Sequence, residues 1–203
     1  MAHQTTQPAD PSGRSTQAVA MAHSLRMLRA VRHYADDALD EEMVHGWLES
    51  ARWCGSSRNS QPWRFIVVDD PASRRELAGL GEHAHHLAEA PLVIVLAADP
   101  GPFPFSTVFD LGRVAQSLML AAAADGVGSC IAVFEPPANM DRARSLLSIP
   151  DGIRVDLAIG FGRATTGDGP PSVPPPERPS PPGRRSLAEV AYRGVWGNPY
   201  DRS

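Results

Sequence analysis

Apolar residues along the chain fall at helical spacing in some stretches and in short continuous runs in others. From residue 109 to residue 125 they recur at one-turn intervals and on nearly every side, which predicts a long helix that is central or lies at a subunit interface. Short β-branched runs predict buried strands, because a strand covered on both faces needs no polar alternation. The predicted strands are residues 65–68, 91–98, 129–133 and 153–159.

Capping and turn signals indicate where the helices begin and end. Ser24 is a candidate N-cap for a helix whose apolar residues are Leu25, Leu28, Val31 and Tyr34. Asp40 opens a second helix, with carboxylates where the helix dipole favours them. Gly126 is expected to end the long helix as its C-cap. Shorter helices are expected from residue 71, from residue 136 to 147 and from residue 186 to 192, and a stiff Pro-rich loop at 102–105.

Three segments of different composition follow one another along the chain. Residues 1–22 are polar and aperiodic, which predicts a disordered tail. Residues 23–164 alternate strands and helices, which predicts one α/β or α+β domain with a sheet of four or five strands. Residues 165–203 start with a stretch dense in Pro and Gly that cannot form a central element. We expect this segment to be an extended arm that wraps a partner subunit.

Length, charge and cysteine content narrow the class of protein. The chain has 203 residues and a formal charge of −4, and without a basic stripe it is not expected to bind nucleic acid. The longest apolar run, 118–124, is too short to span a bilayer, and the first 20 residues lack the apolar core of a secretory signal. Cys54 and Cys130 suggest no disulfide framework, so we expect a cytoplasmic protein.

The loop between the second helix and the first strand carries an unusual set of polar groups. Residues 56–61, named here the signature loop, read Ser-Ser-Arg-Asn-Ser-Gln and lead into Pro62 and Trp63. Asn59 and Gln61 offer amide donors and acceptors that can recognise the edge of a flat heterocycle. The alternative is an ordinary helix-to-strand loop beside a buried Trp; we expect Arg64 to face solvent in either case.

Arginines near both ends of the chain could bind an anion. Arg29 and Arg32 are three residues apart and would share a helical face, where two guanidinium groups suit a phosphate. A solvated basic face is the alternative. With Arg184 and Arg185, they would suit a ligand that has a phosphate at one end and a heteroaromatic edge at the other. The sequence shows no phosphate-binding loop, no serine nucleophile motif, and no partner cluster that would make a metal site of His83, His85 and His86.

Five segments, in order, resemble the FMN-dependent nitroreductase family over about residues 25–197. The most specific is Ser56 to Phe65, which is similar to the family signature Ser-x-x-Asn-x-Gln-Pro-Trp-x-Phe. The other four begin at Arg29, Asp110, Gly126 and Arg184, and read Arg-Ala-Val-Arg-His-Tyr, Asp-Leu-Gly-Arg-Val-Ala-Gln-Ser-Leu, Gly-Val-Gly-Ser-Cys and Arg-Arg-Ser-Leu. The chain departs from the family pattern at Leu28, where the family has an arginine, and at Ala30, where it has a serine.

The resemblance implies a fold and a mode of assembly. The fold would be an α+β three-layer sandwich, with a central, mainly antiparallel sheet flanked by helices. The C-terminal arm would be exchanged in a homodimer, with FMN at the subunit interface. By motif position, the phosphate would be held by Arg29, Arg32, Arg184 and Arg185, beside Ala30. The ribityl chain and pyrimidine edge would meet Ser56, Ser57, Asn59 and Gln61, and the ring would lie against the backbone of Ile131, Ala132 and Val133.

The resemblance also implies a reaction. NAD(P)H would reduce the flavin, and a nitroaromatic, quinone or related small molecule would then take the electrons in the same pocket. No protein residue is predicted to act as a catalyst, because a flavin carries its own redox chemistry. The departures at Leu28 and Ala30 motivate an alternative, a protein of the same fold that binds or sequesters flavin with little turnover. A third possibility is a different flavin reaction on the same fold.

Overall fold

The computed structural model describes residues 15–102, 104–165 and 184–200 of the chain. The chain divides into two units, Met1–Pro170 and Pro171–Ser203, which are described separately. The first unit contains five α-helices among its described residues: α1 (Thr16–Met27), α2 (Glu41–Arg52), α3 (Pro71–Ala78), α4 (Pro104–Ala124) and α5 (Pro137–Leu146). Its strands are β1 (Trp63–Val68), β2 (Leu92–Ala98), β3 (Gly128–Val133) and β4 (Arg154–Gly162), and its 3-10 turns are η1 (Ser57–Asn59) and η2 (His85–Leu87).

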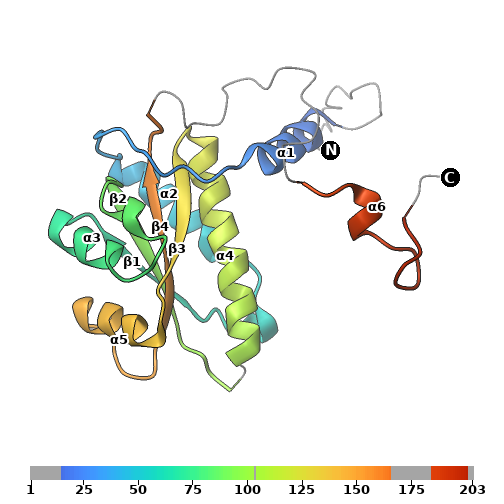
Figure 1. Cartoon of the computed structure of the whole chain (residues 1–203). Helices are drawn as coiled ribbons and strands as arrows, with labels where there is room; N and C mark the ends of the chain where they lie inside the picture. The colour runs from blue at the N-terminus through green and yellow to red at the C-terminus, as the bar shows by residue number, and fades with distance from the viewer. Residues whose placement is uncertain (1–14, 103, 166–183, 201–203) are drawn as a thin grey trace, which may run out of the picture. The chain divides into compact units, whose positions relative to one another are not determined.

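The four strands form one antiparallel sheet in the order β1-β2-β4-β3. Helices α2 and α4 lie on one face of this sheet and α3 and α5 on the other (Figure 1). All seven residues of β2 are buried, because the strand is covered on both faces and has a neighbour on each side. The predicted α+β class and mainly antiparallel sheet are therefore confirmed.

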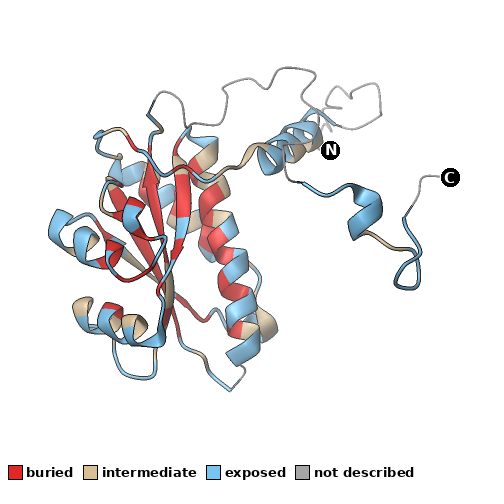
Figure 2. Ribbon diagram, viewed as in Figure 1, coloured by how far each residue is buried: buried red, intermediate tan, exposed pale blue. Residues whose placement is uncertain are grey.

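Alternate residues of the central strands serve two separate hydrophobic cores (Figure 2). Val93 and Val95 point to the α3 and α5 side, whereas Ile94 and Leu96 point to the α2 and α4 side. On the latter side the buried Trp47 packs its ring 5.4 Å from that of Phe161, centroid to centroid. Each helix layer is thus fixed to the sheet by its own set of side chains.

The first helix differs from its prediction. Its N-cap is Ser15, whose hydroxyl accepts a hydrogen bond from the backbone N–H of Ala18, and it ends at Met27. The predicted helix from Ser24 to Tyr34 is therefore wrong, because Val31 and Tyr34 are buried in an extended segment beside the sheet. The tail predicted for residues 1–22 is wrong from Thr16 onward, and residues 1–14 lie outside the described part of the chain.

The long helix α4 has the predicted end and an earlier start. It begins at Pro104 instead of Phe109, since proline suits the first turn of a helix, so the loop predicted for 102–105 is one turn too long. It ends in a Schellman motif: Gly126 has a φ of 72°, and the N–H of Val127 donates to the carbonyl of Ala122. The predicted C-cap is confirmed.

The second unit is described from Arg184 to Tyr200. Its helix α6 (Leu187–Val190) starts in a capping box of Ser186 and Glu189 and is shorter than predicted. The rings of Tyr192 and Trp196 stack with centroids 4.7 Å apart. Most of the Pro-rich stretch predicted to be an extended arm, residues 166–183, lies outside the described residues.

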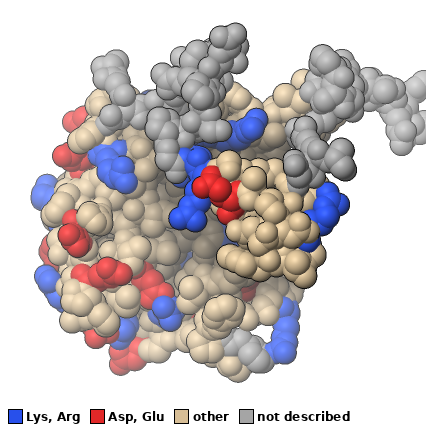
Figure 3. Space-filling model, turned by 45° about the vertical axis from the view of Figure 1, so that its right-hand side comes forward, with Lys and Arg blue, Asp and Glu red and all other residues tan. Residues whose placement is uncertain are grey.

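Two surface properties complete the description. None of the described helices is both long enough and apolar enough to cross a lipid bilayer. On the face shown in Figure 3, Arg side chains are interspersed with Asp and Glu side chains.

Candidate functional site

The signature loop has an unusual backbone. Arg58, Asn59 and Gln61 have φ values of 53°, 56° and 46°, in the left-handed region that residues other than glycine rarely adopt. Each such residue costs on the order of 1–3 kcal/mol, and such residues cluster at functional sites. The signature loop is therefore held in its shape by contacts that offset this cost.

Some of these contacts lie within the signature loop itself. The N–H of Asn59 donates to the carbonyl of Ser56, and the N–H of Ser60 to the carbonyl of Ser57, both at 3.0 Å. The hydroxyl of Ser56 accepts from the N–H of Gln61 at 2.9 Å. The exposed side chains of Asn59 and Gln61 leave amide groups at the surface, as the recognition of a heterocycle requires.

A contact from α4 anchors the signature loop to the core. Asp110 is 1% exposed, and its Oδ2 accepts a hydrogen bond from the N–H of Ser57 at 2.9 Å. The guanidinium of Arg113 lies 3.5 Å from Oδ1 of the same carboxylate. A Cβ atom at Gly55 would come within 2.9 Å of that guanidinium, so a side chain there would displace it. The sequence gave Asp110 and Arg113 no role at the site, although an acidic residue on an apolar helix calls for a partner.

The second predicted group lies along the outer edge of β3. Ala30 pairs with Ser129, and the N–H of Val31 donates to the carbonyl of Ser129 at 3.0 Å. Gly128 permits this approach, because a Cβ there would come within 2.6 Å of the buried Val31 side chain. The segment 28–34 therefore covers the outer edge of β3.

The two N-terminal arginines do not share a helical face, so that prediction is wrong. Both follow the end of α1 at Met27. Arg29 donates from Nη1 to the carbonyls of Arg26 and Leu28, at 2.7 and 2.8 Å. Arg32 is exposed and lies near the thiol of Cys130. They remain close along the chain, at the end of the sheet where the segment 28–34 meets β3.

Behind this edge lies a group of buried polar side chains. His86 places Nε2 3.1 Å from the carbonyl oxygen of Cys130 and Nδ1 3.1 Å from that of His83. The hydroxyl of Tyr34 donates to the carbonyl of Gly160 at 3.3 Å. Burial lowers the pKa of His86 and raises the pKa values of the Cys130 thiol and the Tyr34 phenol. These groups therefore favour their neutral forms, which suits a structural role better than proton transfer.

The residues expected to lie against a ring are on β3. Ile131 and Val133 are 40% and 46% exposed and point to the α4 side of the sheet, whereas Ala132 is buried on the opposite face. Helix α4 also exposes large apolar side chains near its start, with Phe105 at 87% and Phe109 at 64%. Uncovered apolar groups on two neighbouring elements are typical of a surface that binds a ligand or a partner.

The register of the sheet places the two groups at diagonally opposite corners of one chain. The signature loop precedes Trp63, which aligns through Ala98 with Arg154 at the start of β4. The segment 28–34 meets β3 at Ser129, which aligns with Phe161, seven residues further along β4. Strand rise and spacing put the corners roughly 25–30 Å apart. One FMN molecule cannot reach both, so within one copy the structure does not bring the predicted residues together.

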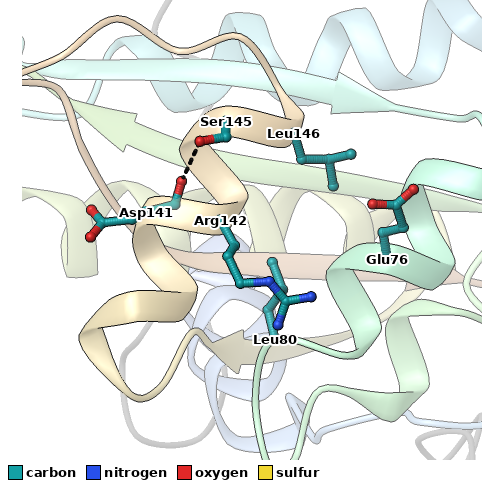
Figure 4. Close-up of a pocket in the computed structure, with 6 residues that line it drawn as sticks. All are labelled: Glu76, Leu80, Asp141, Arg142, Ser145 and Leu146. Carbon is teal, nitrogen blue, oxygen red and sulfur yellow. Dashed lines mark hydrogen bonds between the residues drawn. The ribbon is translucent and has the colours of Figure 1, made fainter.

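Two further features lie apart from these groups. Arg184 and Arg185 belong to the second unit and are exposed, so their place beside the phosphate stays a prediction. A cavity of about 440 Å³ lies between α3 and α5 and is lined by Glu76, Leu80, Asp141, Arg142, Ser145 and Leu146 (Figure 4). Among the described residues, none of those predicted from the motifs lines it. Nor does any group of three His, Cys, Asp or Glu side chains in the described ranges lie as a metal site requires.

The chain is similar to a protein of Archaeoglobus fulgidus that carries the double name NADH dehydrogenase/NAD(P)H nitroreductase. The two are 31% identical over 149 residues, which cover 70% of this chain and 86% of the relative. A crystal structure of a Parabacteroides distasonis protein with the same double name has a TM-score of 0.75 at 23% identity, and the match covers 87% of this chain and 99% of that one. The likeness to this structure concerns the fold.

A second solved structure is more similar in sequence. An FMN-dependent nitroreductase from Clostridium difficile is 27% identical and has a TM-score of 0.67, over 71% of this chain and 87% of its own. The model of the Nitroreductase family matches residues 25–85 and 79–163, which contain the signature loop, Asp110 and β3. The chain therefore belongs to the nitroreductase family.

Proposed function

We propose that the protein is an FMN-dependent oxidoreductase that passes electrons from NAD(P)H to a nitroaromatic, quinone or related small molecule. Family membership and the names of the relatives support an oxidoreductase that uses a pyridine nucleotide. The FMN dependence of the Clostridium difficile neighbour supports the flavin. The cofactor would supply the electron-accepting ring, and the chain would bind and orient it.

The side chains in each corner fit one part of FMN. Asn59 and Gln61 present amide groups that suit the pyrimidine edge. At the other corner, Arg29 and Arg32 suit the phosphate, and the exposed Ile131 and Val133 offer an apolar surface for the ring. Arg184 and Arg185 would add to the phosphate site from the C-terminal arm. Each corner alone would hold only part of the cofactor.

The single observation that carries the proposal is this diagonal separation. Two copies related by a twofold axis would bring the signature loop of one copy to the Arg29 corner of the other, which makes two equivalent sites. The apolar side chains exposed on α4 and β3 would be covered in such a dimer. The site would thus belong to the pair of copies and to neither copy alone.

Mixed dimers test this arrangement directly. Asn59→Ala damages one corner and Arg32→Gln the other, so each variant alone should have two weakened sites. Co-expression with two affinity tags isolates the mixed dimer, in which one site carries both changes and the other carries none. We expect about half of the wild-type flavin content and activity in the mixed dimer, since twofold symmetry leaves one of two sites intact. Recovery no better than that of the single variants would contradict a shared site.

An anaerobic visible spectrum tests the chemistry. Purified protein loaded with FMN should show flavin absorption that bleaches on addition of NADPH or NADH and returns on addition of a nitroaromatic or a quinone. Flavin absorption that persists under an excess of both donors would support the alternative, a flavin-sequestering protein. Leu28 and Ala30, where the family has an arginine and a serine, motivate that alternative. Failure to bind flavin after reconstitution would refute both.

A further inference from the structure

A second, smaller pocket opens beside the signature loop. It has a volume of about 200 Å³ and lies between this loop and the connection from β2 to α4. Its lining includes Ser57 and Arg58 of the signature loop, Arg64 of β1, Asp99 after β2, and Ser106 and Thr107 of α4. This pocket, named here the arginine pocket, therefore has a wall in common with the proposed flavin site.

The two arginines give the arginine pocket its character. Arg58 lines it from a left-handed backbone position in the signature loop, whose shape is fixed by the hydrogen bond from Ser57 to Asp110. Arg64 lines it from the start of β1, where its Nη1 donates to the carbonyls of Trp63 and Gln61 at 2.8 and 3.3 Å. These bonds hold the Arg64 side chain in place and leave the rest of its guanidinium for other acceptors.

Other groups in the lining also favour an oxyanion. Hydroxyl groups come from both walls, and Ser106 and Thr107 stand in the first turn of a 21-residue helix, whose amino end favours negative charge. Asp99 is the acidic member of the lining, and its Oδ1 accepts from the N–H of Gly101 at 3.0 Å, as in a turn. The two guanidinium groups therefore leave the arginine pocket with a net positive charge.

We propose that the arginine pocket binds an oxyanion, a phosphate or a carboxylate, carried by one of the two substrates of the flavin. The proposal rests on the proposed function, because that function places the flavin against the signature loop. A volume of about 200 Å³ accepts a phosphate or carboxylate group with a few neighbouring atoms and excludes a whole dinucleotide. Arg58 and Arg64 then determine which substrates bind well, and the flavin carries out the electron transfer.

The oxyanion can come from the donor or from the acceptor, and separate half-reactions distinguish the two. The donor arm compares NADPH, NADH and the uncharged 1-benzyl-1,4-dihydronicotinamide. The acceptor arm compares 4-nitrobenzoate with nitrobenzene. In the double variant Arg58→Gln/Arg64→Gln, the ratio of the KM of the charged substrate to that of its uncharged analogue should rise about tenfold in one arm, as expected for loss of a charge-assisted hydrogen bond. Arg142→Gln, at the cavity between α3 and α5, is the matched control.

A binding measurement keeps this proposal separate from the flavin chemistry. Titration of the flavin-free full-length protein with pyrophosphate, followed by calorimetry, should give a signal in the wild type and in Arg142→Gln that is lost in the double variant. If flavin fails to bind or to bleach while this difference persists, the proposed function falls and the oxyanion site stands. If pyrophosphate binding and both KM ratios in the double variant match those of Arg142→Gln, with equal melting temperatures, the oxyanion site is refuted.

Discussion

The carboxylate of Asp110 and the backbone N–H of Ser57 form a 2.9 Å hydrogen bond between α4 and the signature loop, 53 residues apart in the chain. The carboxylate is buried, and the N–H belongs to the residue that precedes two left-handed ones. This bond, supported by Arg113, makes the shape of the signature loop depend on the position of α4. Asp110 is therefore a positioning residue for any ligand held by that loop.

Replacement of Asp110 should weaken flavin binding more than it weakens the fold. Asp110→Ala leaves the N–H of Ser57 without its acceptor, which costs about 1–3 kcal/mol in the free energy of unfolding. We expect the FMN dissociation constant, measured by fluorescence titration, to rise at least tenfold, with partial rescue in Asp110→Asn because the amide oxygen still accepts. The control Asp125→Ala removes the hydrogen bond from Nε1 of Trp47 at the far end of α4. An equal loss of flavin affinity in that control would refute the positioning role.

Two glycines should respond differently to a methyl group. In Gly128→Ala the new Cβ would come within 2.6 Å of Val31, which is fully buried and cannot retreat, so we expect a loss of about 1–3 kcal/mol in the free energy of unfolding. In Gly55→Ala the new Cβ meets the flexible end of Arg113, which can move away. Urea unfolding should therefore show a small change for Gly55→Ala. Equal losses in the two variants would contradict the difference in freedom between Val31 and Arg113.

Acidification should destabilise the protein through His86. Burial lowers the pKa of His86 in the folded state below the model value of 6.5. Below that value the unfolded chain takes up a proton that the folded chain does not, so the free energy of unfolding falls as the pH falls, by at most about 1.4 kcal/mol per pH unit. The loss stops once the pH is below the folded pKa. Arg32 and Glu89 act on His86 in opposite directions, Arg32 lowering its pKa and Glu89 raising it.

Urea unfolding between pH 5 and pH 8 measures this slope. In His86→Gln the contribution of His86 to the slope between pH 5 and pH 6.5 should vanish. His45→Gln, at an exposed position of α2, is the control and should keep the wild-type slope. A wild-type slope in His86→Gln would show that other groups carry the pH dependence.

The two cysteines should differ in reactivity toward a thiol reagent. Cys130 is buried, and burial raises its pKa, so little thiolate forms at neutral pH. Cys54 is half-buried, at the end of α2. We expect one fast-reacting thiol per native chain and two after unfolding. Cys54→Ser should abolish the fast reaction; if it persists in this variant, Cys130 is accessible after all.

Much of the fold could be predicted from local patterns in the sequence. The apolar run of β2 and the long helix α4 were predictable, because burial on two faces and one-turn periodicity leave clear patterns. The first helix was not. Val31 and Tyr34 follow Leu28 at helical spacing, yet both are buried beside the sheet in an extended segment. Tertiary pairing overrode a local periodicity that was compatible with either structure.

The site divides in the same way. The amide and hydroxyl groups of the signature loop identify its chemistry, but its left-handed backbone and its bond to Asp110 depend on contacts far apart in the chain. The separation of the two corners depends on strand order and register. Four strands in the order β1-β2-β4-β3 put residue 30 and residue 61 on opposite edges, and a list of elements along the chain does not contain that order.

The sheet acts as a ruler between the two half-sites. In the proposed dimer, the register between β2 and β4 sets how far the signature loop stands from the Arg29 corner, and each copy is measured by the same ruler. A slip of one residue between these strands would shift one corner by about 3.3 Å relative to the other, in both flavin sites at once. The buried, apolar central strands, which touch no ligand, are therefore under the same functional constraint as the residues that do.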